Sequence, residues 1–303
     1  MSSSRTRLVV VAVLVAVLLG GGIAVWSRQG SDPVPVAAAE PPPGTVSTTT
    51  TTTTTTAAPP TTPAPYRSVV ATAAVPELEV LAERPPDPND PATTAPTTVV
   101  APARVAPIPR VGLNSVGTRK TATGWAFTNP TSFGRPFVLA VSEVDGDWLR
   151  VEIPARPNSQ EGWVRAADVT LSESEFRMEL TLSDLTLRVL QGDAVVVETQ
   201  VVIGRPDTPT PVGTFYLGEV LSAQQAGVGS PAGAYGPFIL ATSAYSETLE
   251  LFDGGLPVIA FHGTNQPGLI GTQASNGCIR MPNEVVTQLA GMLPAGTVIT
   301  IAT

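Results

Sequence analysis

The chain has 303 residues and a formal net charge of −8, with one cysteine, Cys278, and one histidine, His262. An acidic chain without clustered basic residues argues against nucleic-acid binding, and a single cysteine excludes an intrachain disulfide. One histidine and one cysteine are too few for a zinc site unless carboxylates join them, so we expect no metal and no cofactor.

The first 26 residues predict a membrane anchor. Residues 1–7 are polar and carry Arg5 and Arg7, and residues 8–26 are uncharged and mostly apolar. A helix of this length spans about 28 Å, close to the roughly 30 Å hydrocarbon core of a bilayer. Arginines ahead of such a run favour a cytoplasmic N-terminus. We expect a single-pass signal-anchor in the cell membrane and an exported remainder, with cleavage near residues 22–24 or 37–39 as the alternative.

Residues 27–110 predict a disordered linker. Residues 48–56 are all threonine, and prolines recur on both sides. Such composition buries too little apolar surface to offset the entropy of ordering, and proline extends the chain. We expect a passive spacer, which is also a candidate for O-glycosylation. A short apolar patch at residues 78–81 suggests a docking segment.

Residues 111–172 predict a small β unit. Asp145 and Gly146 form a turn signal between two apolar or alternating runs, and a third run follows: residues 136–141, 148–153 and 162–164. The stretches around Trp148 and Trp163 resemble the bacterial Src-homology-like barrel that often precedes cell-wall enzymes. Both tryptophans follow the strand alternation and are expected in the core, with stacking on a ligand as the alternative.

Residues 176–303 predict a second β-rich domain. Alternating or apolar runs suggest strands at residues 177–182, 185–190, 194–202, 215–220, 238–242, 258–261 and 298–302. One helix is indicated, with Asn283 as its cap, Val286 and Leu289 on its apolar face and Pro294 ending it. The expected fold class is therefore mainly β, with one or two short helices.

Two motifs contain the chemistry of this domain. His262-Gly263-Thr264-Asn265 precedes Ser275-Asn276-Gly277-Cys278-Ile279-Arg280-Met281. A thiol attacks a carbonyl as the thiolate, and an imidazole beside it supplies the base. A lone cysteine is often a small buried hydrophobe, but polar and glycine neighbours are unlike core sequence. The pair therefore predicts a cysteine nucleophile with a histidine base, and acyl transfer.

Four stretches resemble the L,D-transpeptidase family (YkuD-type catalytic domain): residues 185–190, 204–215, 260–265 and 275–281. The resemblance implies a β-sandwich catalytic domain that cross-links peptidoglycan stem peptides and reacts with carbapenems. It also implies that the Gly263 carbonyl orients the imidazole of His262. We expect the backbone amides of Gly277 and Cys278 to hold the oxyanion, aided by a following helix.

Five further residues are candidates for substrate binding. Many family members have a second histidine where this chain has Asn276, which can still donate hydrogen bonds. Arg280 either binds a stem-peptide carboxylate or bonds backbone carbonyls of the cysteine loop. Tyr235 lies where the family has a flap, or else in a mobile surface loop. Ser275 and Asn265 either touch substrate or hold their loops.

The expected function is a membrane-anchored peptidoglycan L,D-transpeptidase in the cell-wall layer. Cys278 would form a thioester with a donor stem peptide, and an acceptor amine would resolve it to a 3→3 cross-link. Two other functions remain open: an L,D-carboxypeptidase or endopeptidase on the same site, and a non-catalytic wall-binding module.

Overall fold

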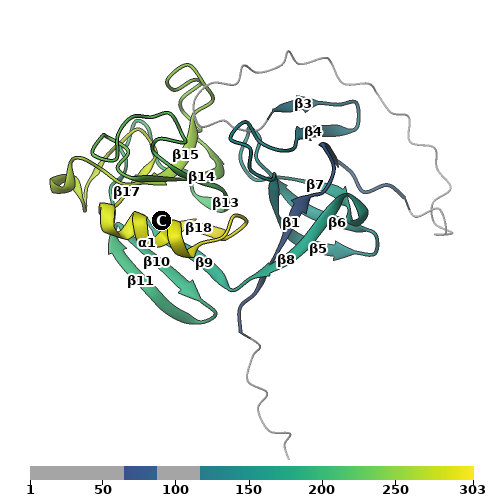
Figure 1. Ribbon diagram of the computed structural model, residues 1–303, viewed down its shortest axis with the longest axis horizontal. Helices are drawn as coiled ribbons and strands as arrows, with labels where there is room; N and C mark the ends of the chain where they lie inside the picture. Colours follow the sequence, from purple (N-terminus) through teal and green to yellow (C-terminus); the bar gives the residue numbers. More distant parts are fainter. Residues whose placement is uncertain (1–64, 87–116) are drawn as a thin grey trace, which may run out of the picture. The chain divides into compact units, whose positions relative to one another are not determined.

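The computed structural model describes residues 65–86 and 117–303 (Figure 1), and within these ranges the chain is mainly β, as predicted. They contain two eight-stranded sheets, one two-stranded sheet and a single α-helix. No helix in these two ranges is long and apolar enough to cross a membrane. The predicted anchor at residues 8–26 and most of the predicted linker lie outside the described residues.

The first sheet has the strand order β3-β4-β2-β7-β6-β5-β1-β8. Its members are β1 (Ser68–Ala73), β2 (Glu77–Leu81), β3 (Thr118–Lys120), β4 (Gly124–Thr128), β5 (Val138–Asp145), β6 (Trp148–Ile153), β7 (Gln160–Arg165) and β8 (Val169–Ser174). The three strands predicted at residues 136–164 are confirmed as β5, β6 and β7. The Src-homology-like barrel remains a prediction.

The predicted linker was wrong over residues 68–81, which form β1 and β2. β1 pairs with β5 and β8, and β2 pairs with β4 and β7. Leu78 and Val80 are fully buried in the core of this sheet, so the apolar patch at residues 78–81 is a core strand and not a docking segment. The two strands are short, and the strands with which they pair lie far along the chain. The proline- and threonine-rich sequence around them therefore suggested a linker.

The second sheet has the order β11-β10-β9-β18-β13-β14-β15-β17. Its members are β9 (Phe176–Thr181), β10 (Thr186–Gln191), β11 (Ala194–Gln200), β13 (Gly213–Ser222), β14 (Phe238–Tyr245), β15 (Val258–His262), β17 (Ile279–Arg280) and β18 (Val298–Ala302). All seven predicted strands are present. Separately, β12 (Ile203–Gly204) pairs with β16 (Gln273–Ser275) in the two-stranded sheet.

The helix α1 (Asn283–Met292) packs against β14 and β15. Val286 and Leu289 are buried in the core of the second sheet, as the apolar face predicted. The predicted cap was wrong, because Asn283 is the first helical residue and Pro282 occupies the cap position without a side-chain hydrogen bond. The Asn283 side chain instead bonds to the loop after β15.

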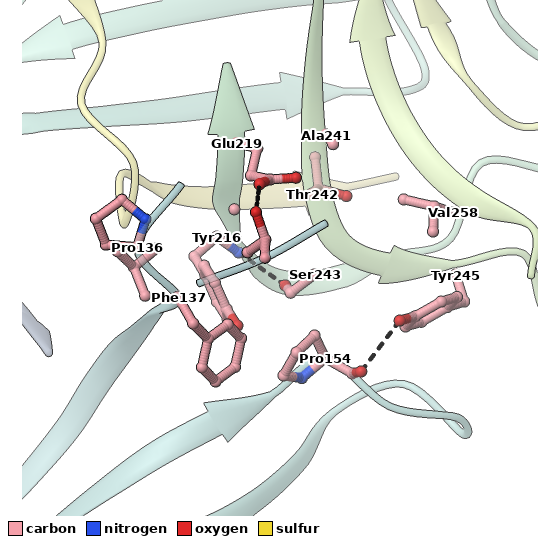
Figure 2. Close-up of a pocket in the computed structure, with 13 residues that line it drawn as sticks. Pro136, Phe137, Pro154, Tyr216, Glu219, Ala241, Thr242, Ser243, Tyr245 and Val258 are labelled. Atoms are coloured by element: carbon pink, nitrogen blue, oxygen red, sulfur yellow. Dashed lines mark hydrogen bonds between the residues drawn. The ribbon is translucent and has the colours of Figure 1, made fainter. Parts of the chain in front are cut away.

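Polar and apolar contacts join the two sheets within the compact unit that includes them. Tyr216 of β13 is buried in the apolar core of the first sheet. Ser243 Oγ of β14 donates to the Glu152 carboxylate of β6 at 2.7 Å, and the Tyr245 hydroxyl donates to the Pro154 carbonyl at 3.1 Å (Figure 2). The buried Glu219 carboxylate, labelled in Figure 2, accepts from the hydroxyl of Thr131, in the segment between β4 and β5. Packing and hydrogen bonds from the first sheet therefore help to hold the second sheet in place.

Candidate active site

Cys278 and His262 line the same pocket, a cavity of about 180 Å³. Its other walls come from the segment before β14, from the segment between β14 and β15, and from the start of β15: Ala234, Tyr235, Ser246, Leu249, Phe252, Pro257, Val258 and Ile259, with Asn276 and Arg280 from the cysteine loop. Three segments far apart in sequence therefore meet at the two residues with acyl-transfer chemistry.

His262 ends β15, and the backbone holds it on both sides. Its carbonyl accepts from the Met281 amide at 2.9 Å, which ties the strand end to β17. The imidazole is 3% exposed, and its Nδ1 lies 2.6 Å from the Gly263 carbonyl oxygen. Since a carbonyl only accepts, Nδ1 carries the hydrogen and Nε2 keeps its lone pair.

Burial lowers the pKa of His262 to about 4, and the charge of Arg280 adds to this, while the bond to Gly263 opposes it. The imidazole is therefore neutral near pH 7, which is the form that can accept a proton. The ring of Tyr235 packs against it with the centroids 4.8 Å apart and the planes tilted by 48°. This contact places Tyr235 over the imidazole at the pocket wall.

Cys278 lies in the short connection between β16 and β17 and remains partly exposed. Its Sγ is 3.8 Å from the Val258 carbonyl oxygen, a weak contact. Burial raises the pKa of the thiol, against the opposing effects of a backbone bond at Ala260 and the charge of Arg280. The resting pair is therefore a neutral thiol and a neutral imidazole, so the proton moves during the reaction rather than before it.

The expectation that the dipole of a following helix acts at Cys278 was wrong. Strand β17 follows the cysteine directly, and α1 begins only at Asn283. The sequence suggested a turn leading straight into the helix because Ile279 and Arg280 are too few to register as a strand. The dipole of α1 therefore does not act at the first turn after the thiol.

Hydroxyl groups hold the cysteine loop. Ser275 Oγ donates to the Cys278 carbonyl at 2.6 Å and accepts from the Gly277 amide at 3.1 Å. Thr210 Oγ1 donates to the Gly277 carbonyl at 2.7 Å, and Thr208 Oγ1 donates to the Ser275 carbonyl at 3.2 Å. The Gly277 amide, expected to hold the oxyanion, is thus bonded to Ser275 in this structure.

Gly277 is required by the shape of this loop. Its φ is +116°, a region that side chains rarely adopt, and an added Cβ would lie 2.9 Å from Ile259 Cδ1. Any larger residue would be strained at this φ, and the end of the Ile259 side chain would have to shift to admit its Cβ.

Arg280 lines the pocket. Its Nε is buried without a hydrogen-bond partner, and no carboxylate of the described ranges forms an ion pair with it. The alternative role expected for Arg280 was a structural bond from its side chain to backbone carbonyls of the cysteine loop. Within residues 65–86 and 117–303, its side chain forms no such bond. Asn276 also lines the pocket, and its Oδ1 accepts from Arg205 at 2.8 Å.

Two of the predicted substrate residues do not line the pocket. Ser275 is buried and bonds the loop as described above, and Asn265 is exposed outside the pocket wall. Sequence reasoning missed Thr208 and Thr210, although both belong to the stretch 204–215 that carried part of the resemblance. In residues 65–86 and 117–303, no three His, Cys, Asp or Glu side chains are grouped as a metal site needs.

Known proteins match this chain in the part that contains Cys278 and His262. Residues 177–301 match the family model of YkuD, the L,D-transpeptidase catalytic domain. A Bacillus licheniformis protein whose name assigns it to the YkuD L,D-transpeptidases is 34% identical over 126 residues, which are 42% of this chain and 65% of that protein. Its namesake in Bacillus subtilis is 30% identical over the same shares of each chain.

The chain thus spans just under two thirds of the length of these curated relatives. Among solved structures, an L,D-transpeptidase from Mycobacterium smegmatis is 18% identical and covers 55% of this chain and 90% of its own, with a TM-score of 0.33. A similarity at this level carries no argument about function. The sequence match is therefore to the L,D-transpeptidase catalytic domain, over residues 177–301, and to the two Bacillus proteins named above.

Proposed function

We propose that this protein is a cysteine-dependent L,D-transpeptidase that forms 3→3 cross-links between peptidoglycan stem peptides. The observation that supports it is one pocket lined by both Cys278 and His262, with Nδ1 of the imidazole held by the Gly263 carbonyl. This leaves Nε2 of a neutral ring as the proton acceptor for a thiol on the same wall.

In the first half-reaction, the Cys278 sulfur attacks the carbonyl of the third-position diaminopimelate of a tetrapeptide donor. His262 Nε2 takes the thiol proton and passes it to the nitrogen of the departing D-alanine. The amide bond breaks, a thioester forms, and D-alanine leaves with the proton. In the second half-reaction, the side-chain amine of an acceptor stem attacks the thioester, and its proton returns through His262 to the sulfur.

The charge on the tetrahedral oxygen needs donors. The Cys278 amide is one, and the Gly277 amide becomes a second if the oxyanion replaces Ser275 Oγ as its acceptor. Arg280 has the chemistry for a stem-peptide carboxylate, because it lines the pocket and forms no ion pair within the described ranges. Asn276, fixed by Arg205, offers its amide hydrogens to substrate.

The site of action is the second part of the proposal. An apolar run at residues 8–26 behind two arginines favours a membrane anchor, and the proline- and threonine-rich stretch after it favours a tether. Such a tether would hold the pocket in the wall layer and raise the effective concentration of stem peptides there.

The test is incubation of the purified protein with tetrapeptide muropeptides, followed by mass spectrometry of the products. Dimers with loss of one D-alanine support the transpeptidase. Tripeptide without dimer would instead support the carboxypeptidase, in which water replaces the acceptor amine.

A carbapenem separates both enzymes from a wall-binding module. An enzyme should gain one carbapenem mass on Cys278, and the Cys278→Ser variant should gain none. The wall-binding module predicts no adduct on either protein and no change in the muropeptides.

A further inference from the structure

We propose that Asn283 is a positioning residue for the base His262, and that it acts through the peptide group between Gly263 and Thr264. The inference rests on the proposed function, because it gives His262 the role of base. Asn283 does not line the pocket, and its side chain accepts from the backbone amide of Thr264. Asn283 forms a hydrogen bond to the same peptide group that accepts the hydrogen bond from the imidazole.

Two hydrogen bonds meet on this one peptide group. Its carbonyl, from Gly263, accepts from His262 Nδ1 at 2.6 Å, and its N–H, from Thr264, donates to Asn283 Oδ1 at 2.8 Å. A peptide group is planar, so its C=O and N–H turn together. Any rotation that frees the N–H from Asn283 also turns the carbonyl away from the imidazole.

Asn283 is well placed to act as a fixed acceptor. It is the first residue of α1, and the helix packs on β14 and β15 through its buried face. Its side-chain oxygen Oδ1 accepts from the Thr264 amide in the neighbouring loop. Because the helix is fixed by its packing in the core, the bond from Asn283 also fixes the loop that follows His262.

Asn283 Oδ1 lies too close to two glycines for either of them to carry a side chain. An added Cβ on Gly263 would lie 2.2 Å from Asn283 Oδ1, and one on Gly236 would lie 2.4 Å from the same atom. Gly236 directly follows Tyr235, whose ring packs against the imidazole. One amide oxygen thus contacts the backbone on both sides of the base.

The bond to Asn283 also strengthens the bond to His262. Hydrogen bonds in series polarise one another, so a peptide whose N–H is bonded is a better acceptor at its carbonyl. The Gly263 carbonyl favours the Nδ1–H form of the ring, which leaves Nε2 as the base. Without Asn283 we expect the two tautomers to mix and the share with a basic Nε2 to fall.

The single histidine of this chain makes the tautomer directly measurable. Nitrogen-15 NMR of the unmodified protein should show one imidazole with hydrogen on Nδ1. Asn283→Ala should show a mixture of tautomers, whereas Asn283→Asp, which keeps an acceptor oxygen, should retain the single form. This readout needs no activity, so it separates a failure of this inference from a failure of the transpeptidase assignment.

The kinetic readout is the rate at which a carbapenem acylates Cys278, followed by intact mass. Asn283→Ala should acylate about 10- to 100-fold more slowly, an effect of the size found when a group that orients a metal-bound histidine is lost. Asn283→Asp should recover most of the rate. The matched control is Thr287→Ala on the same helix, which loses a bond to the Asn283 carbonyl but not to the loop.

Two results would overturn the inference. One is a folded Asn283→Ala variant with the wild-type tautomer and acylation rate. The other is hydrogen on Nε2 in the unmodified protein, a result that does not depend on whether any variant folds. If Asn283→Ala does not fold, the near-isosteric Asn283→Leu variant takes its place.

Discussion

Thr210 Oγ1 donates a 2.7 Å hydrogen bond to the carbonyl of Gly277, the residue before the proposed nucleophile. The same oxygen accepts from the Gly204 amide at 2.9 Å. One buried hydroxyl thus joins the start of the 204–215 stretch to the cysteine loop. The role of that stretch is to support the loop, and no pocket-lining residue comes from it.

Thr210→Val should therefore destabilise the protein and slow acylation. Valine has the same shape but leaves a buried N–H and a buried carbonyl unpaired, which costs about 1–3 kcal/mol for each group. Chemical denaturation and the carbapenem acylation rate measure the two effects. Thr300→Val, at an exposed position of β18, is the control and should change neither. Equal behaviour of the two variants would contradict this role for Thr210.

The pH dependence of acylation reports on His262. Burial lowers its pKa to about 4, so the ring should remain a base down to about pH 4 and lose activity only below that. The acid limb of the acylation rate against pH should thus lie well below the ordinary histidine value of about 6.5. An acid limb near pH 6.5 would show that the ring is more exposed than this structure has it.

His262→Gln should lower acylation by roughly 10²- to 10⁴-fold, the usual cost of losing a general base. Asn276 replaces the second histidine that many family members have, so no other imidazole can substitute. Circular dichroism should be unchanged. Acylation of His262→Gln at the wild-type rate would place the base elsewhere.

Glu152 of β6 should make the protein less stable as the pH rises. Burial raises its pKa to about 8, with a smaller contribution from Glu161, while the Ser243 hydroxyl that donates to it opposes the shift. The unfolded chain ionises near 4.5, so between about pH 4.5 and 8 unfolding releases a proton. Stability should therefore be fully present below pH 4.5 and fall by up to about 1.4 kcal/mol per pH unit until about pH 8.

Urea unfolding between pH 4 and 9 measures this slope. Glu152→Gln removes the ionisation and keeps an oxygen that can accept from Ser243, so its stability should change less over the same range. Tyr216 and Glu161 interact electrostatically with Glu152 and remain unchanged in the variant. Identical pH slopes for both proteins would rule out Glu152 as the source.

The sequence predicted seven of the eight strands of the second sheet, because their apolar or alternating runs are long, and it missed only the two-residue strand β17. It also identified Cys278 and His262, the only residues of their kind in the chain. It did not predict β1 and β2, which gain their stability from strands far along the chain. Contacts such as those of Thr210 and Asn283 depend on loops brought together by the fold, and no local pattern reports them.

The position of β1 sets how much of the N-terminus can be removed. An added Cβ on Gly296 would lie 2.3 Å from Val70 Cγ1, and Val70 shares a core with Tyr216 of the second sheet. A chain of residues 65–303 should be soluble and as active as the full chain on muropeptides in solution. A chain of residues 110–303 should unfold more readily, because each buried side chain lost with β1 and β2 contributes about 1.5–3 kcal/mol.

Thermal melting and the muropeptide assay compare the two truncations. Equal melting temperatures would mean that β1 and β2 add nothing to the second sheet. Loss of activity in the 65–303 chain alone would mean that residues 1–64 take part in catalysis.

The most direct test of the central proposal is mass spectrometry of tetrapeptide muropeptides after incubation with the wild-type protein and with Cys278→Ser. The wild type should produce 3→3 linked dimers with release of D-alanine. Cys278→Ser should keep its circular dichroism spectrum and produce no dimer, because a hydroxyl is a far weaker acid than the thiol. Dimers from Cys278→Ser at more than a few per cent of the wild-type rate would contradict the account.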